Sequence, residues 1–171
     1  MRICIYSPEE IIPLLSRVNR FLGEAYAQPG IELSMSEELL CVAIGFEGQQ
    51  IIAHGAAYLR EMYQLSEPFL AGMIAGVAVA PFYRGKGYSK KILGCLESHL
   101  RDARAEQVFI CASELHYYQS SGYQLFEPPV LLQEQPSPDW NHLMFNGSIH
   151  KPLGVNLLDR QALVEFRGGM Y

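Results

Sequence analysis

The spacing of apolar and polar residues divides the chain into short strands and a few helices. Alternating or continuous apolar positions predict strands at residues 2–6, 41–46, 50–62, 69–80, 107–112, 123–126, 143–149 and 163–166. Helical periodicity predicts one helix from residue 7 to about residue 22, one that begins at residue 88, and a short one at residues 114–120. Residues 23–36 mix glycine, proline and polar residues, and a further short helix is one interpretation of them. Residues 47–48 are expected to form a hairpin turn.

Two of the predicted helices carry clear local signals. Ser7, Pro8 and Glu10 supply an N-cap, a proline in the first turn and a capping-box carboxylate, and a kink is expected at Pro13. The apolar face of the second helix consists of Tyr88, Ile92, Leu93, Leu96 and Leu100. Its charged residues are expected mostly on other faces, and they are Lys90, Lys91, Glu97, Arg101 and Arg104.

The order of the elements predicts a mixed α/β fold (α+β) in one domain that spans residues 1–171. Strand 69–80, a glycine-containing turn, a helix and strand 107–112 form a crossover, so these two strands should pair in parallel. The other strands follow one another closely, as in an antiparallel sheet. Residues 127–141 contain four prolines and are expected to form a surface loop.

Composition narrows the classes of partner. The formal net charge is −5, so the chain lacks the broad basic surface that nucleic-acid backbones require, and a cationic ligand suits it better. The longest uncharged run, residues 68–83, is interrupted by glycine and proline, so no membrane segment is expected. Four cysteines without a CxxC pair, and no secretory signal, favour a reduced, cytoplasmic protein.

The segment after strand 69–80 carries the most informative motif. Arg84-Gly85-Lys86-Gly87-Tyr88-Ser89 joins a strand to a helix, and its glycines can let backbone N–H groups converge on a phosphate at the helix start. Arg84 and Lys86 add positive charge, and Arg84 could contact a phosphate through two nitrogens. Neither a P-loop nor a dinucleotide fingerprint is present. The alternative is a plain strand-to-helix turn with solvated charges.

These residues resemble the GNAT superfamily of acyl-coenzyme A dependent N-acetyltransferases, whose pattern is Arg or Gln, two residues, Gly, one residue, then Gly or Ala. Ser89 departs from the last position but is small. Residues 117–123 resemble the family's second motif, an aromatic residue and tyrosine followed three residues later by glycine and another aromatic residue. The resemblance implies a GNAT fold, a twisted, mostly antiparallel sheet with one parallel crossover at the acyl-CoA site and helices on both faces. It implies acetyl-CoA as co-substrate, bound by Val77, Ala78, Val79, Arg84, Gly85, Lys86, Gly87, Tyr88 and Ser89.

The chain is also similar, more loosely, to the aminoglycoside 2'-N-acetyltransferase branch. The similar features are residues 51–54, the strand end at residues 76–79 and a C-terminus that ends in an aromatic residue, Tyr171. The resemblance implies that the terminal carboxylate binds a cationic substrate and that the protein is a homodimer. Asp139 and Asn141 are further candidates for acceptor binding. Two acidic residues of that branch are absent: Ala75 replaces one, and the other falls near residues 169–170.

Tyr118 matches the family position of the acid that protonates the departing thiolate, and a phenol with an ordinary pKa of about 10 suits that task. The alternative is a half-buried core tyrosine. A backbone N–H in residues 77–79 is the expected oxyanion donor. The candidates for the general base are Glu114, His54, Glu165, the carboxylate of Tyr171 and ordered water. His54 also fits a core histidine, and Cys111 fits a small buried side chain better than a nucleophile. The histidines and cysteines show no metal-binding spacing.

The sequence therefore predicts an enzyme that moves an acetyl group from acetyl-CoA directly to a primary amine of a small cationic, aminoglycoside-like acceptor. Two alternatives remain open. One is an enzyme that acetylates proteins or peptides. The other is a non-catalytic acyl-CoA-binding module, which is supported by the absence of a carboxylate at Ala75.

Overall fold

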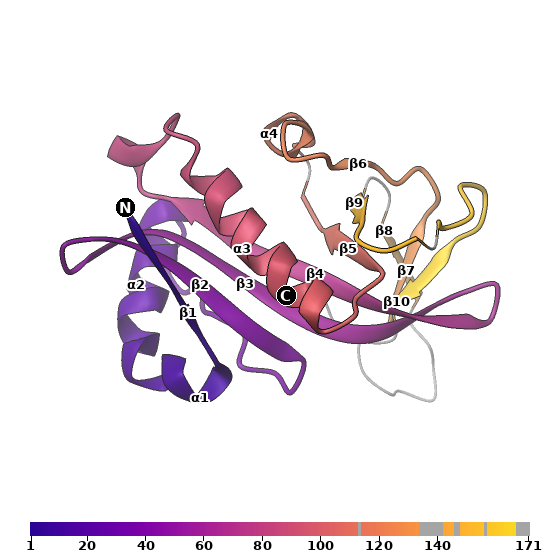
Figure 1. Cartoon of the computed structure of the whole chain (residues 1–171), viewed down its shortest axis with the longest axis horizontal. Helices are drawn as coiled ribbons and strands as arrows, with labels where there is room; N and C mark the ends of the chain where they lie inside the picture. Colours follow the sequence, from indigo (N-terminus) through magenta and orange to yellow (C-terminus); the bar gives the residue numbers. More distant parts are fainter. Residues whose placement is uncertain (113, 134–141, 146–147, 156, 167–171) are drawn as a thin grey trace. The chain divides into compact units, whose positions relative to one another are not determined.

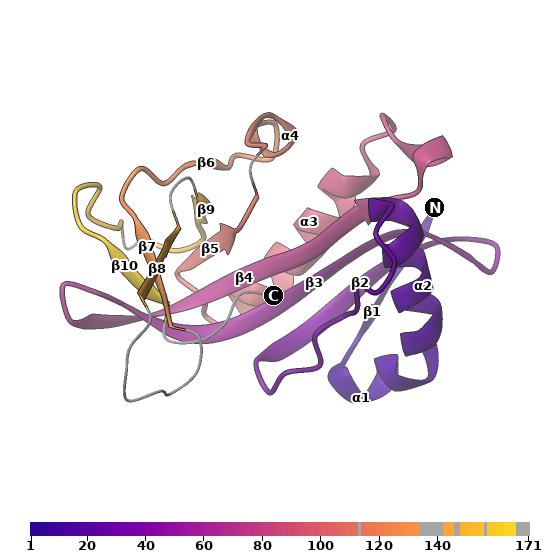
Figure 2. The same cartoon turned by 180° about the vertical axis from the view of Figure 1, so that it is seen from behind.

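The computed structural model describes residues 1–112, 114–133, 142–145, 148–155 and 157–166. Contacts within the chain define two compact units. The elements of both are labelled in Figures 1 and 2. The first unit consists of Met1–Tyr58 and Ile74–Leu100, and the second of Leu59–Met73 and Arg101–Tyr171. Strands β3 (Gln50–Gln64) and β4 (Glu67–Val79) each run from one unit into the other. A single domain over the whole chain stays a prediction.

The first unit is built on antiparallel strands. Its elements are β1 (Arg2–Tyr6), α1 (Pro8–Ile11), the 3-10 helix η1 (Ile12–Leu14), α2 (Leu15–Tyr26), β2 (Leu39–Glu47), the first part of β3, the last part of β4, the 3-10 helix η2 (Pro81–Tyr83) and most of α3 (Tyr88–Asp102). Strand β1 pairs with β2, and β2 pairs with β3 around a turn at residues 48–49. The N–H of Ala80, just past β4, donates to the Ile52 carbonyl of β3 at 2.9 Å.

The N-terminal helical segment follows its sequence signals closely. The Ser7 hydroxyl accepts from the Glu10 N–H, and the Glu10 carboxylate accepts from the Ser7 N–H, which completes the predicted capping box. Pro13 lies in η1, since proline cannot continue the hydrogen bonds of an α-helix. Helix α2 then runs on to Tyr26, beyond the expected end. The short helix expected within residues 23–36 is wrong, because these residues contain the end of α2 followed by irregular chain.

Helices cover both faces of the first unit's sheet, as the predicted fold class requires. Adjacent residues of a strand point to opposite faces, so His54 and Gly55 mark the two sides. A Cβ at Gly55 would lie 2.7 Å from Ile92 Cγ2, which shows how closely α3 approaches this face. On the other face, Leu22 of α2 comes within 3.7 Å of a Cβ built on Gly76. Four residues of the predicted apolar face of α3 are buried, and Tyr88 is half-buried. Glu97, which was expected on an outer face, is also buried, with 4% exposure.

The second unit contains the later strands and one short helix. Its elements besides the ends of β3, β4 and α3 are β5 (Gln107–Ile110), α4 (His116–Gln119), β6 (Gln124–Leu125), β7 (Val130–Gln133), β8 (His142–Phe145), β9 (Ile149–Pro152) and β10 (Val164–Phe166). The strand order is β6-β9-β5-β4-β3-β10-β7-β8. Residues 71–73 of β4 pair in parallel with residues 107–109 of β5, which confirms the predicted crossover.

Three features of the second unit differ from the sequence prediction. Strand β7 lies inside the segment that was predicted to be a surface loop. The single strand expected at residues 143–149 is two strands, β8 and β9. A second parallel pair is present, since β10 pairs with β7 in parallel and with β3 antiparallel. None of the described helices is long and apolar enough to cross a membrane.

Candidate functional site

The turn between η2 and α3 has a backbone that favours glycine at two positions. Gly85 and Gly87 have φ angles of +75° and +71°, in the left-handed region where a side chain is strained. A Cβ at either position would meet no protein atom within 4 Å, so the space over the turn is open. The helix ladder of α3 starts here, with the Lys91 N–H donating to the Gly87 carbonyl at 3.3 Å. The N–H groups of a helix's first turn have no acceptor inside the helix and can bind an anion.

Arg84 connects this turn to two other elements. Its Nε donates to the Val79 carbonyl at 3.0 Å, at the end of β4. Its Nη2 donates to the Ala25 carbonyl at 2.9 Å, in the last turn of α2. Two of the three guanidinium nitrogens therefore hold the turn in place, while the side chain stays exposed. A direct contact between Arg84 and a phosphate stays a prediction.

Basic and aromatic side chains gather around the same turn. Lys86 Nζ lies 5.0 Å from the centre of the Tyr83 ring, and Lys91 Nζ lies 5.8 Å from that of Tyr88. The two tyrosine rings stack with centres 6.5 Å apart. The Tyr83 hydroxyl donates to the Glu47 carboxylate of β2. Positive charge is thus concentrated beside the open face of the turn, which suits an anionic ligand.

The last residues of β4 offer backbone groups along an outer edge. The Ala80 N–H points toward β3, so the N–H and C=O groups of Val77 and Val79 face the opposite edge. The Tyr26 hydroxyl reaches that edge and donates to the Val77 carbonyl at 3.1 Å. Strand β4 pairs with β5 only as far as Met73 and continues to Val79. An extended ligand with amide groups could pair with residues 77–79.

A buried histidine adjoins the start of this edge. Gly76 has a φ of +61° inside β4, which is typical of a β-bulge. His54 Nδ1 lies 2.7 Å from the Gly76 carbonyl oxygen, and the His54 side chain has no exposed surface. Burial lowers the pKa of His54 to about 4, so the ring is neutral at neutral pH and Nδ1 donates to the carbonyl. Because it is fully enclosed, His54 does not contact a bound amine, and this burial sets it aside as a general base.

Tyr118 belongs to the second unit, on α4. It is half-buried, and its ring packs edge-on against Tyr123 with centres 6.0 Å apart. Its neighbour Tyr117 is 67% exposed, so the two tyrosines point in different directions as predicted. Glu114 pairs with His116 at 3.5 Å on the exposed surface. Burial raises the pKa of the Cys111 thiol to about 11, which agrees with a packing role for this residue and not with an activated nucleophile.

Other candidate residues are distributed as follows. Glu165 lies on β10, opposite Tyr63 of β3 and Leu131 of β7. Three predicted acceptor-binding residues lie outside the described residues, and these are Asp139, Asn141 and Tyr171. Among the residues that the structure describes, no group of three or more His, Cys, Asp or Glu side chains could hold a metal ion.

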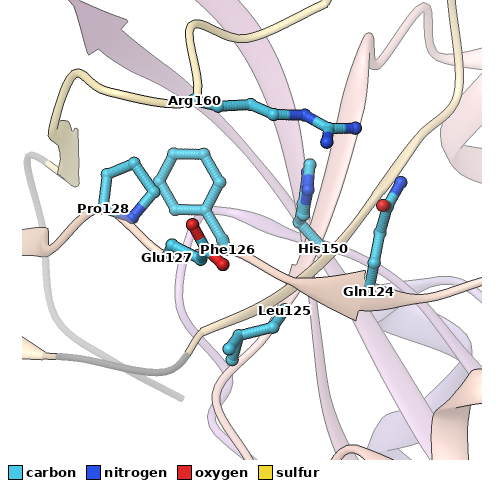
Figure 3. A pocket seen from close by; sticks show the side chains of 7 residues that line it. All are labelled: Gln124, Leu125, Phe126, Glu127, Pro128, His150 and Arg160. Atoms are coloured by element: carbon cyan, nitrogen blue, oxygen red, sulfur yellow. The ribbon is translucent and has the colours of Figure 1, made fainter.

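The second unit also contains a cavity of about 170 Å³ that holds none of the predicted site residues (Figure 3). It is lined by Gln124, Leu125, Phe126, Glu127, Pro128, His150 and Arg160. His150 stacks on Phe109, and both burial and the Arg160 charge lower its pKa. Sequence reasoning had no signal for this cavity, because its residues come from three separate segments.

Sequence reasoning also missed Tyr26 and the contact between His54 and Gly76. Tyr26 lies in a stretch whose composition gave no clear structural signal. The His54 and Gly76 pair had a weak signal, a histidine in one buried strand and a glycine inside the next.

Comparison with known proteins gives a family and several similar folds. The family model of the acetyltransferase (GNAT) domain matches residues 17–126. No curated protein matches the chain in sequence.

Among solved structures, a GNAT family acetyltransferase from Brucella melitensis in complex with acetyl-CoA has 15% identity and a TM-score of 0.64, with 97% of this chain and 96% of that chain covered. An aminoglycoside acetyltransferase from an uncultured soil metagenomic sample has 16% identity and a TM-score of 0.58, with 70% and 86% covered. The ribosomal-protein-S18-alanine N-acetyltransferase from Escherichia coli has 14% identity and a TM-score of 0.59, with 91% and 96% covered. At these identities the likeness concerns the fold.

Proposed function

Because the chain belongs to the GNAT family of acetyltransferases, we propose that it moves an acetyl group from acetyl-CoA directly to a primary amine of a small cationic, aminoglycoside-like acceptor. The observation that carries this proposal is the turn at Gly85 and Gly87. Its open face, positive φ angles and helix start are what a pyrophosphate needs to approach the backbone closely.

The residues of the first unit fit coenzyme A in two further ways. Lys86 and Lys91 place positive charge at the turn, where the phosphates would bind. On the outer edge, where Tyr26 and Arg84 occupy the carbonyls of Val77 and Val79, the Val79 N–H can donate to a carbonyl of a pantetheine arm. Arg84 would act mainly by holding the turn against β4 and α2, so that its N–H groups keep one arrangement before the ligand binds.

In the proposed reaction a neutral amine attacks the thioester carbonyl carbon, the new C–N bond forms and the C–S bond breaks. A backbone N–H of residues 77–79 stabilises the negative charge on the carbonyl oxygen. Tyr118 gives its hydroxyl proton to the departing thiolate, which leaves as coenzyme A thiol. The proton lost from the amine goes to a base. Glu114, Glu165, the carboxylate of Tyr171 and ordered water are the candidates, now that the burial of His54 sets it aside.

A cationic acceptor is supported by the net charge of −5 and by the resemblance of residues 165–171 to the aminoglycoside branch. One similar fold is that of an aminoglycoside acetyltransferase. In this proposal Asp139, Asn141 and Tyr171 bind ammonium groups of the acceptor. Ala75 supplies no carboxylate in β4, so the acceptor is bound differently from that of the resembling branch.

A second candidate function is acetylation of a protein or peptide N-terminus. It is favoured by one observation, the similarity of the fold to that of the ribosomal-protein-S18-alanine N-acetyltransferase from Escherichia coli, whose name gives a protein as the acceptor. Both functions use the same coenzyme A site and differ only in the acceptor.

The experiment that separates these functions measures coenzyme A thiol release from acetyl-CoA with three sets of acceptors. Aminoglycosides and polyamines form one set, N-terminal peptides the second, and buffer alone the third. Release that depends on the first set supports the proposal, and release with peptides supports the second candidate. If no set of amines increases thiol release above that in buffer alone, both enzyme functions are contradicted, and the non-catalytic acyl-CoA-binding module is the remaining alternative.

We also propose that the protein works as a cytoplasmic homodimer. The four cysteines, Cys4, Cys41, Cys95 and Cys111, form no disulfide, which agrees with a reducing compartment. The dimer rests on the resemblance to the aminoglycoside branch alone. Light scattering that gives the mass of a monomer would contradict it.

A further inference from the structure

A buried side chain holds the peptide unit at the bulge of β4. We propose that His54 is a positioning residue for acetyl transfer: by donating to the Gly76 carbonyl it fixes the direction of the Val77 N–H, which then stabilises the oxyanion of the thioester carbonyl. The inference rests on the proposed function and names the donor among residues 77–79. His54 itself touches neither substrate.

The argument begins with the geometry of one peptide plane. The Gly76 carbonyl and the Val77 N–H belong to the same trans peptide, so they point in opposite directions. His54 binds the carbonyl at 2.7 Å. The Val77 N–H therefore points away from the histidine, and its direction cannot change unless this hydrogen bond breaks.

The local backbone depends on the same contact. Gly76 has a φ of +61°, and a Cβ built on it would lie 3.1 Å from Cε1 and 3.2 Å from Nδ1 of His54. A side chain at position 76 would thus strain the backbone and push the imidazole away. The positive φ of Gly76, the lack of room for a side chain beside the imidazole and the short hydrogen bond all concern the backbone at this one position.

A second contact fixes the next peptide. The Val77 carbonyl accepts a hydrogen bond from the Tyr26 hydroxyl at 3.1 Å. Val77 is therefore held from both sides, by His54 through its preceding peptide and by Tyr26 through its own carbonyl. A donor held in this way needs no reorganisation when charge develops, which is how backbone N–H groups contribute to catalysis.

His54 is a poor choice for packing alone. The Gly76 carbonyl can only accept a hydrogen bond, so the neutral His54 ring carries its hydrogen on Nδ1 and a lone pair on Nε2. Nε2 has no hydrogen-bond partner among the described residues. An unpaired buried nitrogen lowers stability, and an apolar side chain of similar size would avoid that loss. Departures of this kind from good packing concentrate at functional sites.

Two variants test the inference. In His54→Asn the side-chain amide nitrogen lies near the place of Nδ1 and keeps a donor for Gly76. In His54→Leu the donor is lost and the volume is kept. Both are compared with wild type by steady-state kinetics with acetyl-CoA and tobramycin, by calorimetry with coenzyme A, and by the ¹³C shift of the Gly76 carbonyl.

We expect His54→Leu to lower kcat roughly 10- to 100-fold, below the roughly 10²–10³-fold loss from complete removal of an oxyanion donor. Coenzyme A affinity should be unchanged, because His54 is enclosed and does not reach the turn at Gly87. His54→Asn should recover much of kcat and keep the Gly76 carbonyl shift of wild type. A folded His54→Leu with wild-type kcat would overturn the inference.

Other outcomes are also decisive. If His54→Leu does not fold, His54→Gln replaces it, because its amide group lies near the place of Nε2 and not near that of Nδ1, which donates to Gly76. Equal kcat for the Asn and Gln variants would then overturn the inference. If the wild-type protein releases no thiol with tobramycin or any other amine, the proposed function itself fails, and the inference fails with it.

Discussion

Replacing Gly87 by valine tests where the pyrophosphate of acetyl-CoA binds. Gly87 has a φ of +71°, and a Cβ there would meet no protein atom within 4 Å. Its substitution therefore costs backbone strain but causes no clash inside the protein. Gly48, in the turn between β2 and β3, is a matched control, because it has a φ of +56° and equally open surroundings.

The two variants should differ only in binding. A non-glycine residue in the left-handed region costs about 1–2 kcal/mol, so Gly87→Val and Gly48→Val should lose similar stability. In Gly87→Val the side chain also fills the space that the phosphates need. Loss of one charge-assisted hydrogen bond, about 1.5–3 kcal/mol, weakens coenzyme A binding by roughly 10- to 100-fold.

The assay is calorimetric titration of coenzyme A into each folded variant, with unfolding in urea to measure the loss of stability. We expect a higher Kd for Gly87→Val and the wild-type Kd for Gly48→Val. Equal affinities for Gly87→Val and wild type would refute the placement of the pyrophosphate on this turn. Equal weakening by both variants would show that the effect comes from lost stability and not from the site.

Four further predictions concern other parts of the molecule. Tyr118→Phe deletes only a hydroxyl and should lower kcat by about 10²–10⁴-fold with coenzyme A affinity kept, whereas wild-type turnover would assign the proton to another donor. Arg84→Lys keeps the charge but loses the guanidinium group that donates to the carbonyls of Val79 and Ala25, so the turn is held less firmly and calorimetry should show weaker coenzyme A binding. An unchanged Kd would show that Arg84 does not prepare the turn for the ligand. Burial lowers the pKa of His54 from 6.5 to about 4, so the unfolded chain takes up a proton at a higher pH than the folded protein does. The free energy of unfolding should therefore be highest above pH 6.5 and should fall by about 3 kcal/mol as the pH falls to 4. In urea unfolding, His54→Leu should not show this fall, and an equal fall in both proteins would assign it to other groups. Deletion of Met170 and Tyr171 should raise the KM for tobramycin, more at low salt than at high salt, and leave coenzyme A affinity unchanged; unaltered amine kinetics would remove the C-terminus from the acceptor site.

Local signals in the sequence predicted local structure well. The capping box at Ser7 and Glu10 and the apolar face of α3 depend on residues three or four positions apart, and both are confirmed. The glycines at 85 and 87 were expected to shape a turn, and both have positive φ angles. Strand β7 was not predicted because it has only three apolar residues and one glutamine, with prolines on both sides, which is typical of a loop. The predicted strand at residues 143–149 contains a turn signal, the Asn146-Gly147 dipeptide, between the positions of β8 and β9.

Long-range contacts at the site could not be predicted from spacing. The hydrogen bonds from Tyr26 to Val77 and from Arg84 to Ala25 join residues more than fifty positions apart. The burial of His54 and its contact with Gly76 depend on the pairing of neighbouring strands and on α2 covering them. Glu97 is different, because it lies four residues after Leu93 and three before Leu100, so helical spacing places it beside the apolar face and only its charge favoured an outer face. Periodicity predicts which face of an element is apolar, but not which distant polar group meets it.

Direct transfer of an acetyl group to an amine is the central claim, and it can be measured in one reaction. The protein is incubated with acetyl-CoA and tobramycin, and the released coenzyme A thiol and the acetylated amine are quantified together by a thiol reagent and mass spectrometry. The account predicts that the two products form in equal amounts, that both require the amine, and that Tyr118→Phe slows both alike. Thiol release without an acetylated amine, or no release with any amine at all, would contradict it.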